Sequence, residues 1–258
     1  MPRLLQRTLS ARVGLLLIGV DALATSSHSH AASLRAEAGY WDYRLSGEVT
    51  DNNPLDFERD LGVQTRTHNY QRLRFRVGPN WLPEIELGRH RLDVQGERLV
   101  VNNLLSFGNL ILLQNETVLD AFADLDDLTL TARYPMSLSP TVTAHAGLTL
   151  RNVDGPIEIR DQANGDTEDD ALDETFPQLH LALDWAATPA LTLKAEGDWI
   201  EYGRDRAWQW RVGLDWTWVG GFGISAGYHA RHFRVSSRNF DLDAHFDGAQ
   251  IGVIYRWQ

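Results

Sequence analysis

Apolar and polar residues alternate along most of the chain. Between positions 178 and 186, Leu179, Leu181, Leu183 and Trp185 alternate with polar or small residues. A period of two is typical of a strand whose two faces meet different surroundings. Ten segments share this pattern and are therefore predicted to be strands: 34–45, 69–77, 84–94, 125–134, 141–153, 178–186, 191–202, 207–219, 222–235 and 246–257.

The connections between these segments alternate in length. Short ones, rich in Pro or Gly, fall at 78–83, 135–140, 187–190 and 220–221, and the others span 46–68, 95–124, 154–177, 203–206 and 236–245. Outer-membrane barrels have this asymmetry, with short periplasmic turns and longer extracellular loops, and an even number of strands. The sequence therefore predicts an all-β, single-chain transmembrane antiparallel β-barrel of about ten strands. Eight and twelve strands are the alternatives.

The last complete octet of the chain reads Gln250-Ile-Gly252-Val-Ile-Tyr255-Arg-Trp257. Its alternation assigns Ile251, Val253, Tyr255 and Trp257 to the lipid side, and Gln250, Gly252 and Arg256 to the lumen. Such an ending is typical of a strand that completes a membrane barrel.

Several other segments accompany this octet: 36–43 (AEAGYWDY), 55–63 (LDFERDLGV), 199–203 (WIEYG), 226–228 (AGY) and 246–248 (FDG). Together they resemble a family of small proteobacterial outer-membrane β-barrel proteins whose function is not established. The resemblance implies a location in the outer membrane of a Gram-negative bacterium. It also implies that the outer-membrane assembly machinery reads Gln250, Gly252, Tyr255 and Trp257 as a signal. The chain departs from the pattern by ending on Gln258 instead of an aromatic residue.

The beginning of the chain has the features of a signal peptide. Arg3, Arg7 and Arg12 precede a short apolar run at 13–20, which is followed by the small-residue site Ala22-Leu-Ala. We expect a signal peptide at 1–24, with cleavage as late as 32, and a barrel domain at 33–258. The chain contains no cysteine, so no disulfide can stabilise the fold.

The formal charge of the chain is −11. This acidity argues against nucleic acid as a partner. The expected partners are outer-membrane lipid, lipopolysaccharide and the assembly machinery, and we expect a monomer.

The face opposite the apolar stripe carries charged residues of both signs. The candidate lumen network consists of Arg35, Glu37, Arg72, Arg74, Arg76, Glu86, Asp127, Arg133, Arg151, Asp184, Lys194, Glu196, Asp198, Arg211, Asp215 and Arg231. Barrels of this size are filled by side chains, and buried charges need partners. We therefore expect a polar, ion-paired and closed lumen.

Aromatic residues gather near the predicted strand ends, where amphipathic rings settle at a membrane interface. The interfacial candidates are Trp81, Tyr134, Trp185, Trp208, Trp218 and Trp257.

Two of the predicted loops have an unusual composition. Segment 154–177 is acidic, and Asp166, Glu168, Asp169 and Asp170 are weak metal-ligand candidates, although the spacing matches no EF-hand. A solvated acidic loop is the alternative, and no cofactor is expected. Segment 99–113 is too apolar for a freely solvated loop. It could cap the barrel mouth, lie against lipid, or continue the flanking strands.

Two residue sets superficially resemble catalytic groups. Asp124 and Asp126 with Asp243 and His245 suggest an omptin-like protease, but their parity assigns all four to the outer wall. His232 and Ser236 suggest a lipid-A-modifying hydrolase, but no nucleophile motif surrounds them. The sequence therefore favours a structural, adhesive or lipid-contacting role, with narrow transport of small or hydrophobic solutes as the alternative and catalysis below both.

Overall fold

The computed structural model describes residues 32–50, 54–60, 62–63, 66–78, 82–101, 105–107, 110–112, 116–162, 165, 167–236 and 241–257. All belong to one compact unit, Ala31–Gln258. The expected signal peptide at 1–24, Trp81 and Asp166 lie outside the described residues, as do the side chains of Glu168, Asp169 and Asp170.

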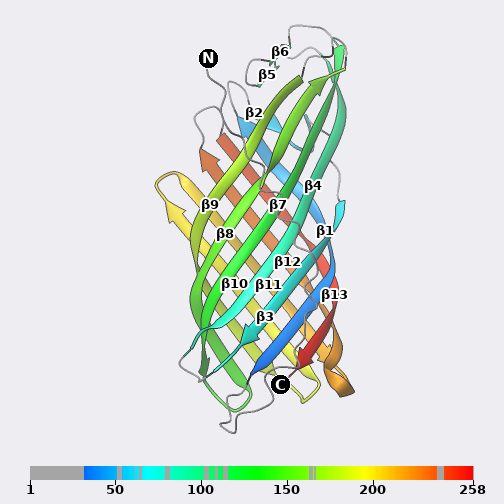
Figure 1. Ribbon diagram of the computed structural model, residues 1–258. Coiled ribbons are helices and arrows are strands. Elements are labelled where there is room, and N and C mark those ends of the chain that lie inside the picture. Colours follow the sequence, from blue (N-terminus) through cyan, green and yellow to red (C-terminus); the bar gives the residue numbers. More distant parts are fainter. Residues whose placement is uncertain are drawn as a thin grey trace, which may run out of the picture. The chain divides into compact units, whose positions relative to one another are not determined.

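Within the described part of the chain, ten long strands form a closed antiparallel barrel (Figure 1). They are β1 (Ser33–Thr50), β3 (Arg66–Arg76), β4 (Glu84–Val101), β7 (Glu116–Ser137), β8 (Val142–Asp161), β9 (Thr167–Ala186), β10 (Leu191–Tyr202), β11 (Asp205–Thr217), β12 (Phe222–Ser236) and β13 (Asp241–Trp257). Each pairs with the next, and β13 pairs with β1 from Leu34↔Trp257 to Thr50↔Asp241, which closes the wall. The predicted ten-stranded barrel is confirmed.

Three short strands and one 3-10 turn complete the described elements. β2 (Pro54–Asp56) pairs with the end of β1, and β5 (Leu105–Phe107) pairs with β6 (Leu110–Leu112) in a separate hairpin. The turn η2 (Val219–Gly221) joins β11 to β12. Among the described residues, no helix is long and apolar enough to cross a membrane.

The strands extend further at one end than the alternation predicted. We call this the loop end, and the end that holds 187–190 and η2 the turn end. Segments 46–68, 95–124 and 154–177 were predicted to be loops. Instead β1 continues to Thr50. β4 extends to Val101 and β7 begins at Glu116, while β8 extends to Asp161 and β9 begins at Thr167. The loop prediction was wrong for 46–50, 154–161 and 167–177 because these strand ends are rich in acidic and small residues, which resemble loop composition. In 95–124 the described ends of β4 and β7 agree with the alternative that segment 99–113 continues the flanking strands.

Pairing between strands is incomplete toward the loop end. β9 and β10 pair only as far as Leu179↔Trp199, and β3 and β4 only as far as Tyr70↔His90. Beyond these pairs the wall consists of a four-stranded sheet (β4, β7, β8, β9) and a six-stranded sheet (β10 to β13, β1, β3). Apolar side chains from both sheets meet in one buried cluster between them.

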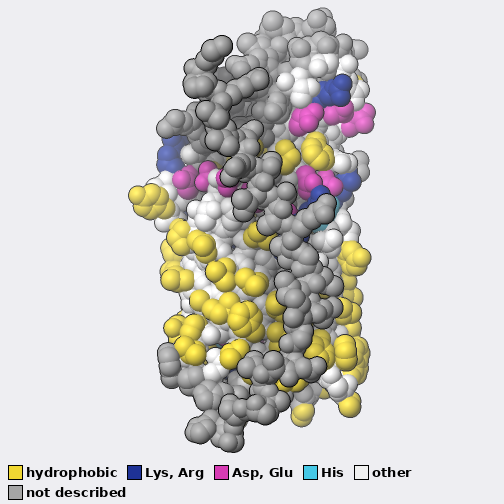
Figure 2. Space-filling view, viewed as in Figure 1, with side chains coloured by type: hydrophobic (Ala, Val, Ile, Leu, Met, Phe, Trp, Pro, Cys, Tyr) yellow, Lys and Arg dark blue, Asp and Glu magenta, His cyan; other side chains and the backbone are white. Residues whose placement is uncertain are grey.

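The outer wall carries an apolar belt near the turn end. Leu128, Leu150, Leu181 and Ile251 all point outward and are between 45 and 65% exposed. Figure 2 shows hydrophobic side chains gathered over the lower part of one face and charged ones above them. An exposed apolar band of this kind is the surface that a membrane barrel presents to lipid.

Outward ion pairs begin where the belt stops. Arg89 pairs with Asp126 at 2.7 Å, and Arg91 pairs with Asp124 at 2.6 Å, both between β4 and β7. The hydrogen bond from Arg91 lowers the pKa of the Asp124 carboxyl, which lies above the belt. The outer wall is therefore apolar near the turn end and polar near the loop end.

Candidate functional site

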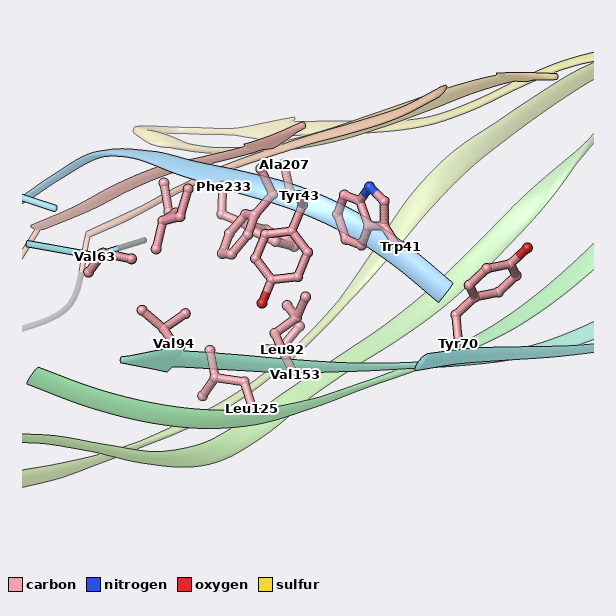
Figure 3. Close-up of a cluster of buried hydrophobic side chains, with 13 residues drawn as sticks. Trp41, Tyr43, Val63, Tyr70, Leu92, Val94, Leu125, Val153, Ala207 and Phe233 are labelled. Carbon is pink, nitrogen blue, oxygen red and sulfur yellow. The ribbon is translucent and has the colours of Figure 1, made fainter. Parts of the chain in front are cut away.

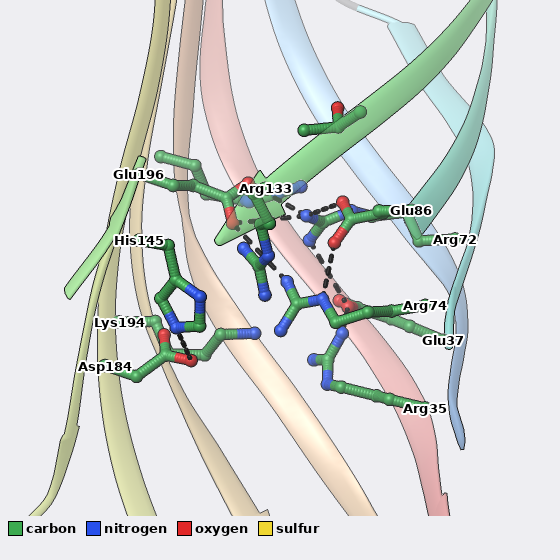
Figure 4. A network of polar contacts seen from close by, with 12 residues as sticks. Arg35, Glu37, Arg72, Arg74, Glu86, Arg133, His145, Asp184, Lys194 and Glu196 are labelled. Carbon is green, nitrogen blue, oxygen red and sulfur yellow. Dashed lines mark hydrogen bonds and ion pairs between the residues drawn. The ribbon is translucent and has the colours of Figure 1, made fainter. Parts of the chain in front are cut away.

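Charged side chains fill the lumen near the turn end (Figure 4). We call this cluster the plug: Arg35, Glu37, Arg72, Arg74, Glu84, Glu86, Arg133, Lys194, Glu196, Arg211 and Asp215. Alternation places its members on the inner face of six different strands.

The plug is held together by ion pairs that cross the lumen. Arg35 binds Glu37 at 2.6 Å on its own strand and Asp215 at 2.9 Å on β11. Arg72 on β3 binds Glu86 on β4, and it reaches Glu196 on β10 at 2.9 Å. These contacts join different walls of the barrel, so the plug spans the lumen.

A second layer lies above the plug and is also buried. Asp127 is fully buried between two arginines, at 3.2 Å from Arg151 Nε and 2.5 Å from Arg231 Nη1. The Arg231 guanidinium lies over the Trp41 ring at 5.3 Å, and Trp41 stacks on His229 at 4.3 Å. This layer is a floor of buried charged and aromatic groups between the plug and the rest of the lumen.

The character of the lumen changes two residues further along the same strands. Leu125 follows Asp127 on the inner face of β7, Val153 follows Arg151 on β8, and Phe233 follows Arg231 on β12; all three are buried in the apolar cluster. Figure 3 shows Tyr43, Leu92 and Phe233 among the side chains that point into the space between the walls.

This apolar half of the lumen contains a cavity of about 100 Å³, which we call the chamber. Leu92, Leu125, Val153, Phe176, Phe233 and Phe246 are among the residues that line it. Two charged side chains also reach the lining, Glu158 on β8 and Glu174 on β9.

The chamber corrects the expectation of a polar lumen along the whole barrel. The apolar stripe changes face partway up a strand: Leu87 is exposed on the outside of β4, whereas Leu92 is fully buried inside. Leu150 and Val153 show the same change on β8. Where the barrel wall extends beyond the bilayer, its outer face meets water, so its apolar side chains point into the barrel. This change of phase is the sequence signal by which the chamber residues could have been found.

The predicted lumen residues all lie on the inner side of the barrel wall. Asp184 is bound by His145 at 3.4 Å, and Asp198 by His180 at 2.8 Å. Within the described residues, Arg76 is the member that the structure brings into no ion pair.

The other candidates are distributed over the barrel as follows. Gln250 and Gly252 face the lumen, and Trp257 is exposed on the outer wall with Tyr255 half-buried. Tyr134, Trp185 and Trp218 are about half exposed near the turn end. Trp208 instead lies half-buried on the outer wall, with its ring centroid 5.5 Å from that of His232 and 5.6 Å from that of His245.

The residues that resembled catalytic groups lie on the outer wall and make other contacts. Asp124 binds Arg91, Asp126 binds Arg89, and Asp243 binds Arg234 and His232, the latter at 2.8 Å. The Ser236 backbone amide donates to Asp205 at 2.8 Å. Among the described residues, no group of three or more His, Cys, Asp or Glu side chains is arranged to hold a metal ion.

Comparisons with known proteins show similarity in fold. No protein-family model matches the sequence, and no curated protein does. The outer-membrane protease OmpT of Escherichia coli superposes with a TM-score of 0.56 at 7% identity, covering 87% of this chain and 97% of OmpT. The translocator domain of the autotransporter NalP of Neisseria meningitidis gives 0.45 at 12% identity (87% and 88% covered). The attachment invasion locus protein Ail of Yersinia pestis gives 0.37 at 11% (88% and 99%). The similarity to OmpT shows that the chain has the fold of an outer-membrane β-barrel.

Proposed function

We propose that this outer-membrane barrel binds a small hydrophobic solute in the chamber and is closed toward the periplasm by the plug. The observation that carries the proposal is the cavity of about 100 Å³ with an apolar lining, which lies directly above a layer of fully buried ion pairs.

Two physical arguments support this function. An apolar cavity stays dry and accepts apolar molecules such as benzene, because burial of their surface is favourable at about 25 cal/mol per Å². The ion pairs of the plug resist opening, because separating Arg72 from Glu86 and Glu196 would leave charges without partners in the lumen. The barrel therefore holds a solute more readily than it conducts one.

Binding is tested with ethylbenzene as the probe and the full-length barrel in lipid nanodiscs. We expect ethylbenzene to shift the methyl NMR signals of Leu125 and Val153, which line the chamber. Val153→Trp should fill the chamber and abolish the shift at Leu125. Leu150→Trp, on the same strand but facing lipid, should leave that shift intact. Unchanged methyl signals at saturating ethylbenzene would contradict the proposal.

Conductance separates this function from narrow transport. A single barrel in a planar bilayer should show no steady current above the leak, because the plug joins opposite walls. A stable open current in the unmodified protein would instead favour a channel.

We further propose that residues 1–24 are removed as a signal peptide, and that Gln250, Gly252, Tyr255 and Trp257 direct assembly of a monomer. The position of the octet in β13, which closes the barrel against β1, supports this role. Trp257→Ala should lower the fraction of barrel that migrates as the folded form on unheated gels, whereas Gln258→Ala should not.

A further inference from the structure

We infer that the solute of the chamber carries a positive charge on its apolar body, so that the chamber selects small amphiphilic cations. This inference rests on the proposed function and adds the charge of the ligand to it.

Among the described residues, the charged groups that reach the chamber, Glu158 and Glu174, are both acidic. Glu174 lies on the same face of β9 as Leu172 and Phe176, and it pairs directly across from the buried Val153 on β8. Glu158 lines the chamber nearer the loop end of β8. A carboxylate at the wall of an apolar cavity favours a ligand that supplies a cation to it, because the attraction between opposite charges adds to the burial of the ligand's apolar body.

The Glu174 carboxylate is available for such a ligand. Among the described residues it forms no ion pair and no side-chain hydrogen bond, and it stays exposed. By contrast, the outward neighbour Asp173 is approached by the Asn152 amide at 3.4 Å. Glu174 therefore differs from the paired acidic residues of the outer wall.

The two arginines of the layer below the chamber are shielded from it. Arg151 and Arg231 are fully buried, are both bound to Asp127, and do not belong to the residues that line the chamber. The Phe233 ring lies 5.7 Å from each guanidinium and separates both from the cavity. An anionic ligand would have to displace Phe233 to reach them, whereas a cationic ligand meets Glu174 directly.

Glu174 lies near an edge of the strand pairing. β9 has no partner in β10 beyond Leu179↔Trp199, so the part of β9 that holds Glu174 is paired only with β8. The formal charge of −11 also draws small cations toward the protein.

The test compares three probes of similar size on the full-length barrel in nanodiscs at pH 7: benzylammonium, its neutral isostere ethylbenzene, and benzoate. We expect benzylammonium to bind most tightly and benzoate most weakly. Glu174→Gln should weaken benzylammonium binding about fivefold, as for a partly exposed ion pair, and leave ethylbenzene unchanged. The matched control Asp173→Asn removes the same charge one residue away, on the outer face, and should change neither.

The outcomes distinguish the two proposals. If ethylbenzene binds but Glu174→Gln leaves benzylammonium affinity unchanged, or if benzoate binds more tightly than benzylammonium, the inference is overturned and the proposed function stands. If no probe shifts the methyl signals of Leu125 and Val153, both are overturned. Heat-modifiable migration of each variant on gels shows that the barrel is folded, so that a loss of binding reports on the site.

Discussion

Asp127 and Asp126 are neighbours in sequence, yet they lie in opposite surroundings. Asp127 is fully buried between Arg151 and Arg231, whereas Asp126 pairs with Arg89 on the outer wall, where both side chains are more than a third exposed. The strand alternation alone produces this difference, because successive side chains point to opposite faces. The same chemical change at the two positions should therefore have very different consequences.

Asp127→Asn should lower the free energy of unfolding by about 3–5 kcal/mol, because it leaves two buried guanidinium groups without their counter-ion. Asp126→Asn should lower it by less than about 1 kcal/mol, as for an exposed pair. Urea unfolding in lipid vesicles, followed by tryptophan fluorescence, measures both. Equal losses in the two variants would show that the floor of the chamber is not held by this ion triad.

The Arg91–Asp124 pair predicts a small pH dependence at the outer wall. The hydrogen bond from Arg91 lowers the pKa of Asp124 in the folded protein, so the pair stabilises the fold above the pKa of the unfolded chain. This contribution is lost as the pH falls through the lowered pKa. Arg91→Gln should raise the pKa of Asp124 toward the ordinary value near 3.9, as followed by carbonyl NMR. A pKa that does not rise would show that the pair does not persist in solution.

At the scale of the strand, the important feature is the position along each strand at which the apolar side chains change from the outer to the inner face. On β9 the outward residues from Leu179 to Trp185 are apolar, whereas Asp173 and Thr175 beyond them are polar. Outward positions therefore meet lipid on one part of a strand and water on the next. The effect of an outward charge on the stability of the barrel should therefore depend on whether its position lies within the belt or beyond it.

Leu181→Arg places a charge within the belt and should destabilise the barrel by about 2–4 kcal/mol, as at a bilayer midplane. Gln71→Arg, an outward change on β3 beyond Leu73, should alter stability by less than about 1 kcal/mol. Unfolding in vesicles compares the two variants. If Leu181→Arg has no larger effect than Gln71→Arg, the belt assigned here is not the lipid-facing surface.

The alternation of apolar and polar residues predicts where the strands lie and which side chains point inward, because both depend on residues that are close in sequence. The Leu179–Trp185 stripe and the inward position of Arg151 could both be read in this way. The change of face before Leu92 and Val153 is also visible in the sequence. The alternation alone does not show which side is buried there, because that depends on where the bilayer ends. The approach of Glu174 to Val153 depends on the register between β8 and β9, which alternation does not specify.

For the whole molecule, closure of the barrel combines these local arrangements into two compartments. The plug needs opposite walls to pair Arg35 with Asp215, and the chamber needs both sheets to bury Phe233. Closure in turn depends on the pairing of the first strand, β1, with the last, β13. A covalent link across this seam therefore tests the architecture as a unit.

Ala38 and Val253 are direct cross-strand partners on the outer wall, so their Cα atoms should be about 4.5–5.5 Å apart, which suits a disulfide. Ala38→Cys with Val253→Cys should oxidise to a single intramolecular bond, because the chain has no other cysteine. After heating in detergent without reductant, the resulting ring should migrate faster than the linear chain. Ala38→Cys with Leu214→Cys, which places the second thiol outward on β11, should give no ring. A failure of the first pair to close, or closure of the second, would contradict the β1–β13 seam on which both the plug and the chamber depend.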